Sequence, residues 1–430
     1  MLFSNISILD ENLDFRKNMY VAVKGDRISY VGASRPEGNF AREYDGSGKL
    51  LMSGFYNAHA HSAMTLLRGY GENMHLQDWL TKRIFPFEEK LDEQSVYKGT
   101  MLAMAESLRF GIVSTTDMYY FCDAMAQAVK DTGVKMNIGR GITNFTDSGL
   151  YGLPSFAEAE KLVATLHNAE NGKIKIDLSI HAEYTSNAQT VREMAQYIKK
   201  TGLNMHVHVS ETKKEHEECV ERHGKTPIEY FCDLGLLDTK TTAAHCVYVT
   251  ENDRRIMKEK GVTAAVNPIS NLKLASGVCN VPALLDDGIN VAIGTDGAAS
   301  NNSLNFFEEI KFFALLSKER FCDPTFITPK QALYAATRAG ALSQGRDDCG
   351  LIKEGFKADL TVVDTSLPNY HPVHDMPTNL VYSASGSDVC MTVIDGEVLY
   401  ENGNYKSLDI SKVIEDADEA TAEILRKLGR

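Results

Sequence analysis

The chain has 430 residues, of which 43% are hydrophobic and 24% charged, the ordinary composition of a globular protein. Its formal net charge is −13 and no basic stretch could follow a phosphate backbone, so we expect no nucleic-acid partner. No apolar run reaches the ~20 residues that cross a bilayer, and the N-terminus lacks the basic and apolar regions of a signal peptide, so we expect no membrane partner.

The two ends of the chain have the pattern of short strands joined by turns. Residues 1–52 and 345–406 are therefore predicted to pair into one small, split β-sandwich domain. The tail, 407–430, is charged and contains several alanines, which indicates a terminal helix. The apolar runs that carry the strand pattern are 6–9, 19–23, 28–31, 358–364 and 391–399.

Between these ends, residues 53–344 alternate between candidate strands and helices eight times. This alternation favours an α/β fold, a (β/α)8 TIM-like barrel. The alternative is a doubly wound open sheet, which usually binds nucleotides through a glycine-rich turn, and no such motif is present. The eight strands are expected to end near His59, Asp117, Arg140, His181, Glu211, His245, Pro268 and Asp296.

Two histidines close the first of these strands. Side chains alternate across a strand, so His59 and His61 point to the same side and form half of a candidate metal site. They could also be chance neighbours in a loop. Three other strand ends carry possible further ligands, namely His208, His245 and Asp296. A single strand-end aspartate is more often a helix cap or turn former, but here it is one of four strand ends with ligating side chains.

The remaining histidines and the cysteines are given no ligand role. His206 lies deeper in the fifth strand and is predicted to pack or to support a ligand. His216 and His223 lie among charges and are better explained by a solvated helix face than by a second metal site. Eight scattered cysteines without a C-x-x-C pair predict free thiols and a cytoplasmic protein. Histidines 75, 167, 371 and 374 are assigned to loops or polar helix faces.

Taken together, five stretches resemble the amidohydrolase superfamily, and most closely the 5-methylthioadenosine/S-adenosylhomocysteine deaminases. They contain the histidine pair, the segment around Glu211, the histidine of the sixth strand, an Asn-Pro segment and the aspartate of the eighth strand. The family's split β-sandwich fits the flanking β segments. The matching stretches are 54–69, 208–212, 244–246, 267–274 and 294–302.

The resemblance implies metal-dependent hydrolytic deamination at C6 of an adenine ring, with ammonia as the leaving group. Glu211 is implied to take a proton from the attacking water and to pass it to the neighbouring ring nitrogen. His245 is implied to hold and polarise that water, and Asp296 to shuttle a proton. One divalent metal with an open position for water is implied at His59, His61, His208 and Asp296.

The metal count and identity follow from the same comparison. Relatives with two metals bridge them with a carboxylated lysine at the fourth strand, whereas this strand ends at His181, so we expect one metal per subunit. Three nitrogens and one carboxylate suit zinc first, with iron, manganese and nickel as alternatives. The segment 181–183 also matches the H-x-E of cytidine-type zinc deaminases, but no P-C-x-x-C follows it.

Four further residues are implied to bind the substrate. By resemblance, His181 contacts the base, Arg140 helps to bind the ligand, and Glu88 bonds the ribose hydroxyls, although an offset of one to Glu89 stays open. Trp79, the single tryptophan, is expected either to wall the pocket or to pack in the core.

The substituent on the ribose is the least defined part of the substrate. The family's S-adenosylhomocysteine users carry a second arginine shortly after the first, and residues 141–170 contain none. This favours smaller 5′-modified adenosines, such as methylthioadenosine, 5′-deoxyadenosine or adenosine. The rivals are an aminohydrolase or chlorohydrolase of a free base (guanine, cytosine or a triazine) and a barrel that has lost catalysis. The oligomeric state stays open.

Overall fold

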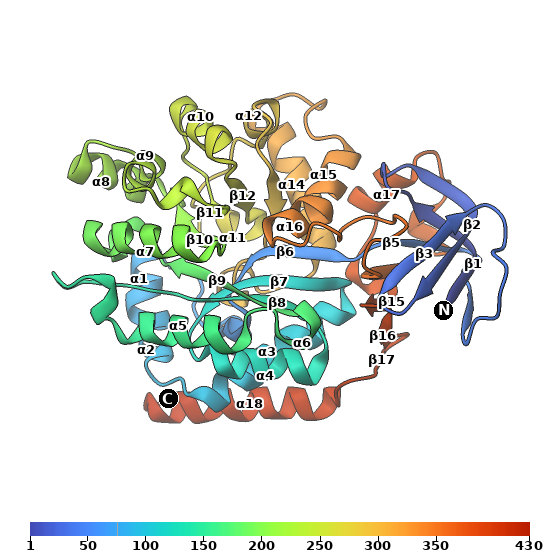
Figure 1. Cartoon of the computed structure of the whole chain (residues 1–430), viewed down its shortest axis with the longest axis horizontal. Helices are drawn as coiled ribbons and strands as arrows, with labels where there is room; N and C mark the ends of the chain where they lie inside the picture. Colours follow the sequence, from blue (N-terminus) through green and yellow to red (C-terminus); the bar gives the residue numbers. More distant parts are fainter. Residues whose placement is uncertain (75) are drawn as a thin grey trace.

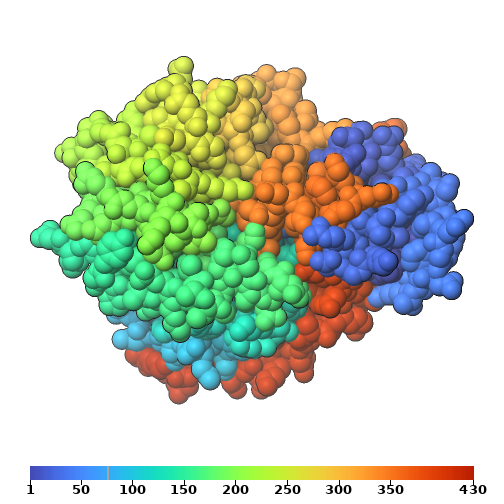
Figure 2. All heavy atoms as spheres, viewed as in Figure 1, coloured from blue at the N-terminus to red at the C-terminus, as the bar shows by residue number. Residues whose placement is uncertain are grey.

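The computed structural model describes residues 1–74 and 76–430, so His75, which was given no role, lies outside the described residues. A barrel of parallel strands surrounded by helices forms the larger part, and a mixed sheet lies beside it (Figure 1). Figure 2 shows segments from both ends of the chain sharing the right-hand surface of the molecule. The predicted TIM-like barrel is confirmed. In the described part, no helix is both long and apolar enough to cross a membrane.

The eight barrel strands pair in parallel and in chain order. Their residues are almost all buried, as expected for strands covered by helices on one face and packed inside the barrel on the other. Each strand ends within three residues of its predicted end. The strands are β6 (Phe55–Ala60), β7 (Ile112–Tyr119), β8 (Lys135–Arg140), β9 (Ile174–Ile180), β10 (Met205–Val209), β11 (Thr241–His245), β12 (Thr263–Val266) and β13 (Val291–Ile293).

The barrel closes between the end of β13 and β6. The backbone N–H of Asp296 donates to the carbonyl oxygen of His59 at 3.0 Å. The Asn57 amide donates to Thr295 Oγ1 at 2.7 Å and accepts from the Thr295 N–H at 3.0 Å. A Cβ on Gly294 would lie 2.9 Å from the backbone nitrogen of His59, so a glycine permits this close approach. Two of the candidate metal ligands therefore lie on either side of the closing seam.

The helices around the barrel begin at capping side chains and often end at glycine. Asn187 caps α7 and Gly202 ends it, while Thr250 caps α10 and Gly261 ends it. The main helices are α3 (Glu93–Arg109), α4 (Cys122–Thr132), α5 (Pro154–Leu166), α7 (Ala188–Thr201), α8 (Lys213–His223), α9 (Pro227–Asp233), α10 (Glu251–Lys260), α12 (Val281–Asp286), α14 (Phe306–Arg320), α15 (Pro329–Ala336) and α16 (Arg338–Ser343). Short helices α1 (Leu76–Trp79), α2 (Phe85–Glu88), α11 (Pro268–Lys273) and α13 (Ala298–Asn301) lie in the loops that follow β6, β12 and β13.

The mixed sheet is built from both ends of the chain, joined where β5 pairs antiparallel with β14. Its strands form one continuous sheet. Val21 and Met391 belong to a small apolar core of their own, whereas Leu50 and Val363 belong to the large core that also contains barrel residues. The last helix, α18 (Ile410–Lys427), packs against α3 at the bottom of the view in Figure 1. The strands are β1 (Leu2–Leu9), β2 (Phe15–Lys24), β3 (Arg27–Gly32), β4 (Glu43–Asp45), β5 (Lys49–Ser53), β14 (Leu360–Asp364), β15 (Val389–Ile394), β16 (Glu397–Glu401) and β17 (Asn404–Tyr405).

A buried ion cluster ties this sheet to the barrel. The Lys135 ammonium donates to Asp359 at 2.6 and 2.8 Å and to Asp395 at 2.7 Å. Burial alone would lower the pKa of Lys135, but the two aspartates outweigh it and raise that pKa. Burial would likewise raise the pKa of Asp359, and Lys135 holds it below its usual value. Because Lys135 begins β8, the cluster lies at the end of the barrel opposite the candidate site.

Candidate metal centre and active site

Four side chains from three strand ends converge at the carboxyl end of the barrel. Asp296 Oδ1 lies 3.5 Å from His59 Nε2 and 3.4 Å from His61 Nε2. His208 Nε2, from β10, lies 3.3 Å from His61 Nε2. Ligand atoms held about 2.1 Å from one tetrahedral ion lie roughly 3.4 Å from each other. The spacing of these donor atoms therefore fits a single metal ion.

Hydrogen bonds behind the histidines fix which ring nitrogen faces this centre. His61 and His208 each place Nδ1 against a backbone carbonyl oxygen, at 2.6 and 2.7 Å. A carbonyl only accepts, so Nδ1 carries the proton and Nε2 turns its lone pair inward. His59 Nδ1 contacts His206 Nε2 at 2.9 Å. His59 Nε2 is buried and has no hydrogen-bond partner among the described residues, an orphaned acceptor that a cation would satisfy.

The electrostatics of the cluster suit ligation. Burial lowers the pKa of His59 to about 3 and that of His208 well below its usual value, so both rings are neutral, as ligands must be. Burial would raise the pKa of Asp296, but the contact with His59 and the nearby imidazoles hold it low. Its second oxygen, Oδ2, accepts from Ser270 Oγ at 2.6 Å and from Ser300 Oγ at 3.2 Å, which leaves Oδ1 directed at the histidines.

A carboxylate and a further histidine lie beside the cluster. Glu211 follows β10, and its Oε2 lies 3.8 Å from His245 Nε2 at the end of β11. Burial raises the pKa of Glu211, which favours a group that takes up and releases a proton. Burial would lower the pKa of His245, but the neighbouring carboxylates, Glu211 first, raise it. Asn271 Oδ1 lies 2.9 Å from His245 Nδ1, and Glu215 accepts the backbone N–H of Glu211 at 2.8 Å.

A small inner cavity of about 100 Å³ joins these groups to three of the predicted substrate residues. Trp79, Glu88 and His181 line it, together with His61, His208, Glu211, His245 and Asp296. Trp79 is only 5% exposed, so it walls this cavity and packs in the core at once. Burial lowers the pKa of His181 to about 4, which keeps its ring neutral and able both to donate and to accept.

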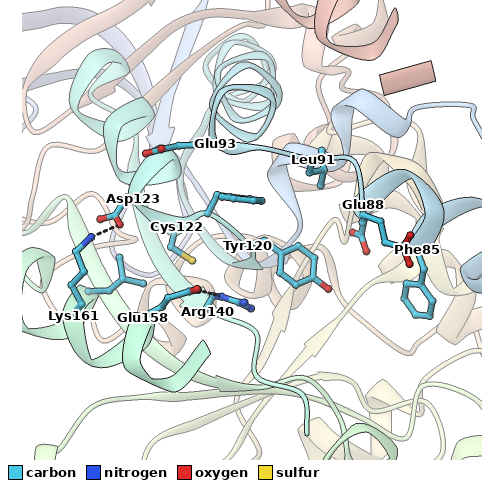
Figure 3. Close-up of a pocket in the computed structure, with 13 residues that line it drawn as sticks. Phe85, Glu88, Leu91, Glu93, Tyr120, Cys122, Asp123, Arg140, Glu158 and Lys161 are labelled. Carbon is cyan, nitrogen blue, oxygen red and sulfur yellow. Dashed lines mark hydrogen bonds and ion pairs between the residues drawn. The ribbon is translucent and has the colours of Figure 1, made fainter. Parts of the chain in front are cut away.

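A larger outer cavity of about 560 Å³ continues from the inner one. The two share Phe85, Glu88 and Tyr120 in their walls. Figure 3 shows Glu88 at one side of the outer cavity and Arg140 beside Tyr120. Arg140, the fourth predicted substrate residue, lines this outer space and not the inner one. Glu89 also lines only the outer cavity, so Glu88 is the acidic residue of the pair that reaches both. Burial raises the pKa of Glu88 to about 7.

Several residues of the site were not identified from the sequence. The Tyr119 hydroxyl is buried beside the inner cavity and has no hydrogen-bond partner in the described part of the chain. Tyr119 is the last residue of β7, and this position could have identified it, because every strand end of such a barrel borders the mouth. Tyr184 lines the same cavity, three residues after His181. Ser270 and Ser300 orient Asp296 from helices α11 and α13, a contact that no sequence spacing predicts.

Comparison with known proteins gives relatives over almost the whole chain, in sequence and in fold. The sequence model of the amidohydrolase family matches residues 50–399. A 5-methylthioadenosine/S-adenosylhomocysteine deaminase of Thermoanaerobacter pseudethanolicus is 38% identical over 430 residues, covering 99% of this chain and 100% of the relative. A 5′-deoxyadenosine deaminase of Methanosarcina mazei is 38% identical over 408 residues, covering 95% and 94%. A solved adenosine deaminase of Xanthomonas campestris with bound zinc superposes with a TM-score of 0.94 at 31% identity, covering 99% and 98%.

Proposed function

The chain belongs to the amidohydrolase family, and we propose that it hydrolyses the adenine amino group of 5′-modified adenosines to give the inosine analogue and ammonia. The candidate substrates are 5′-methylthioadenosine, 5′-deoxyadenosine and adenosine, with S-adenosylhomocysteine as a further candidate. The observation that carries this proposal is the inner cavity, which is lined both by the convergent ligand cluster and by the half-buried Glu88. The names of the full-length relatives support the same chemistry.

We assign one divalent metal ion per subunit to the cluster, with zinc as the first candidate and iron, manganese and nickel as alternatives. Bound there, such an ion would polarise a water molecule and lower its pKa toward neutrality. The orphaned Nε2 of His59 and the zinc in the Xanthomonas campestris adenosine deaminase support this assignment. Metal analysis that finds two ions per chain in active enzyme would overturn it. The assigned ligands are His59, His61, His208 and Asp296.

We assign the proton transfers of the reaction to Glu211 and Asp296. Glu211 takes one proton from the attacking water and delivers it to the ring nitrogen beside C6, so that the ring accepts the new C–O bond. His245, held through Nδ1 by Asn271, directs Nε2 at the water and stabilises its developing charge. Asp296 receives the second proton and passes it to the amino group, which leaves as ammonia. One water is consumed and one ammonia released, so the atoms balance.

The substrate is held by groups from four segments. We assign His181 to the base, Glu88 to the ribose hydroxyls, Trp79 to the wall of the inner cavity and Arg140 to the far end of the ligand. A carboxylate suits two neighbouring hydroxyl donors, because it accepts several hydrogen bonds at once. The eight cysteines, all free, support the assignment to a reducing cytoplasm, and a homo-oligomer is compatible with all of these roles.

A substrate panel tests the proposal. Zinc-loaded and metal-stripped protein are mixed with 5′-methylthioadenosine, 5′-deoxyadenosine, adenosine, guanine and cytosine, and the absorbance change of adenine-to-hypoxanthine conversion and the released ammonia are followed. We expect turnover of the nucleosides by the metal-loaded protein and none by the stripped protein. Turnover of a free base without turnover of any nucleoside would refute the proposal and favour a base aminohydrolase.

A further inference from the structure

The outer cavity is rich in carboxylates, and most of them take no part in the proposed reaction. Besides Glu88, four acidic side chains line it, against two basic ones. Phe85, Leu91 and Leu162 supply apolar wall between them. The charged residues that line it besides Glu88 are Glu89, Glu93, Asp123, Glu158, Arg140 and Lys161.

Both cations of this cavity are already paired. Arg140 Nε donates to Glu158 Oε2 at 2.6 Å, and one terminal nitrogen of the same guanidinium donates to the Gly141 carbonyl oxygen at 2.6 Å. Lys161 donates to Asp123 at 2.8 Å. Figure 3 shows both pairs as dashed lines facing the cavity. Two of the three guanidinium nitrogens of Arg140 thus already donate a hydrogen bond. Few of its N–H groups are left to bind a carboxylate of the ligand in a bidentate manner.

Two other carboxylates of the cavity lie outside these two ion pairs. Glu89 and Glu93 have no ion pair among residues 1–74 and 76–430. A ligand group that enters this space therefore meets an excess of acidic over basic side chains and an arginine that is already paired with Glu158. Because the outer cavity shares Glu88 and Tyr120 with the inner one, a chain that leaves the ribose beside Glu88 is directed into it.

We propose that the outer cavity receives the 5′-substituent of the nucleoside, and that Glu158, by occupying Arg140, makes it select amine-bearing or uncharged substituents over carboxylate-bearing ones. This inference rests on the proposed deaminase function and specifies the substrate class within it. Glu158 acts here as a specificity-determining residue, because it removes from the ligand the one guanidinium that lines the cavity. The side chain of Glu158 is 55% exposed and that of Arg140 15% exposed, so the pair lies at the solvent edge and its effect is screened by salt.

Two substrate analogues of matched length test the charge preference. Metal-loaded enzyme is assayed with 5′-aminopropylthio- and 5′-carboxyethylthio-5′-deoxyadenosine, with methylthioadenosine as the reference, at low and high ionic strength. We expect kcat/KM to favour the amine over the carboxylate by roughly three- to tenfold at low salt, the size of a partly exposed charge contact. The ratio should shrink at high salt.

Two variants then separate the role of Glu158 from general surface charge. Glu158→Gln keeps the shape of the side chain and releases Arg140, so the amine-to-carboxylate ratio should fall or reverse. Glu160→Gln removes the same charge from an exposed position of α5 outside the cavity, and the ratio should stay as in the parent enzyme.

The outcomes distinguish the charge selection from the proposed deaminase function. Turnover of methylthioadenosine with equal or better use of the carboxylate analogue would overturn the charge selection and leave the deaminase function standing. An unchanged ratio in Glu158→Gln would overturn the role of Glu158. Absence of turnover with every nucleoside would overturn the function and this inference together.

Discussion

Glu88 gives the sharpest prediction about the substrate. If its carboxylate binds both ribose hydroxyls, Glu88→Ala removes two hydrogen bonds to a charged acceptor, each worth about 1.5–3 kcal/mol. Even the lower value for both predicts a loss of about 3 kcal/mol, or roughly two orders of magnitude in kcat/KM. The neighbouring Glu89 is exposed and lines only the outer cavity, so Glu89→Ala is the matched control and should keep most of the activity on this comparison.

A substrate that lacks the hydroxyls makes the prediction specific. The parent enzyme and Glu88→Ala are assayed by absorbance with methylthioadenosine and with its 2′,3′-dideoxy form. We expect the parent to prefer the ribose by roughly two orders of magnitude, as above, and the variant to show almost no preference. Because burial raises the pKa of Glu88 to about 7, the carboxylate that accepts both bonds forms above that pH, so the parent's preference should grow from pH 6 to pH 8. If Glu88→Ala slows both substrates equally, Glu88 does not contact the ribose.

Three further predictions concern the barrel and the ligand cluster. Lys135→Met leaves Asp359 buried without its counter-ion, so the free energy of unfolding in urea should fall by about 3–5 kcal/mol while kcat is kept; a smaller loss contradicts the buried cluster. Burial raises the pKa of Asp177 from its unfolded value of 3.8 to about 6. The free energy of unfolding therefore falls as the pH rises from the unfolded pKa through the folded one. Asp177→Asn should therefore melt at a higher temperature than the parent at pH 7 and at the same temperature at pH 4. A melting-temperature difference that is the same at both pH values would refute this. His206→Phe leaves the Nδ1–H of His59 without its hydrogen-bond acceptor, so the affinity for the metal should be about 10–100-fold weaker. Competition with a chromophoric chelator measures this affinity.

The sequence predicts the barrel and the ends of its strands because both follow from local patterns. The spacing of His59, in β6, and His61, the residue after its last one, predicts that both side chains point to the same side whatever surrounds them. The contact of Arg140 with Glu158 has no such signal, since it depends on how α5 is rotated against β8. The closure of the barrel through Asn57 is likewise invisible in the sequence, because its partner lies 238 residues away along the chain.

Three residues at or just after the strand ends of the site have an unusual backbone conformation. Ser210, His245 and Asp296 have φ angles of 49°, 74° and 60°, in the left-handed region that non-glycine residues seldom adopt. Such residues cost of order 1–3 kcal/mol each and persist only where their surroundings impose them. Here Glu215 accepts the N–H of Ser210 at 2.8 Å, and Ser270 donates to Asp296 at 2.6 Å.

Glu309 connects two of these supports. Its carboxyl group, 1% exposed, accepts from the backbone N–H of Ile269 at 3.3 Å and from the amide of Asn301, and so joins α11 to α13. The first of these helices carries Ser270 and the residue that contacts His245, and the second carries Ser300. Glu309 thus supports, through these two helices, the side chains that contact His245 and Asp296, and it does not line the inner cavity itself. The side chains of His245 and Asp296 both line the inner cavity at the mouth of the barrel. The backbone strain therefore lies at residues that face the site.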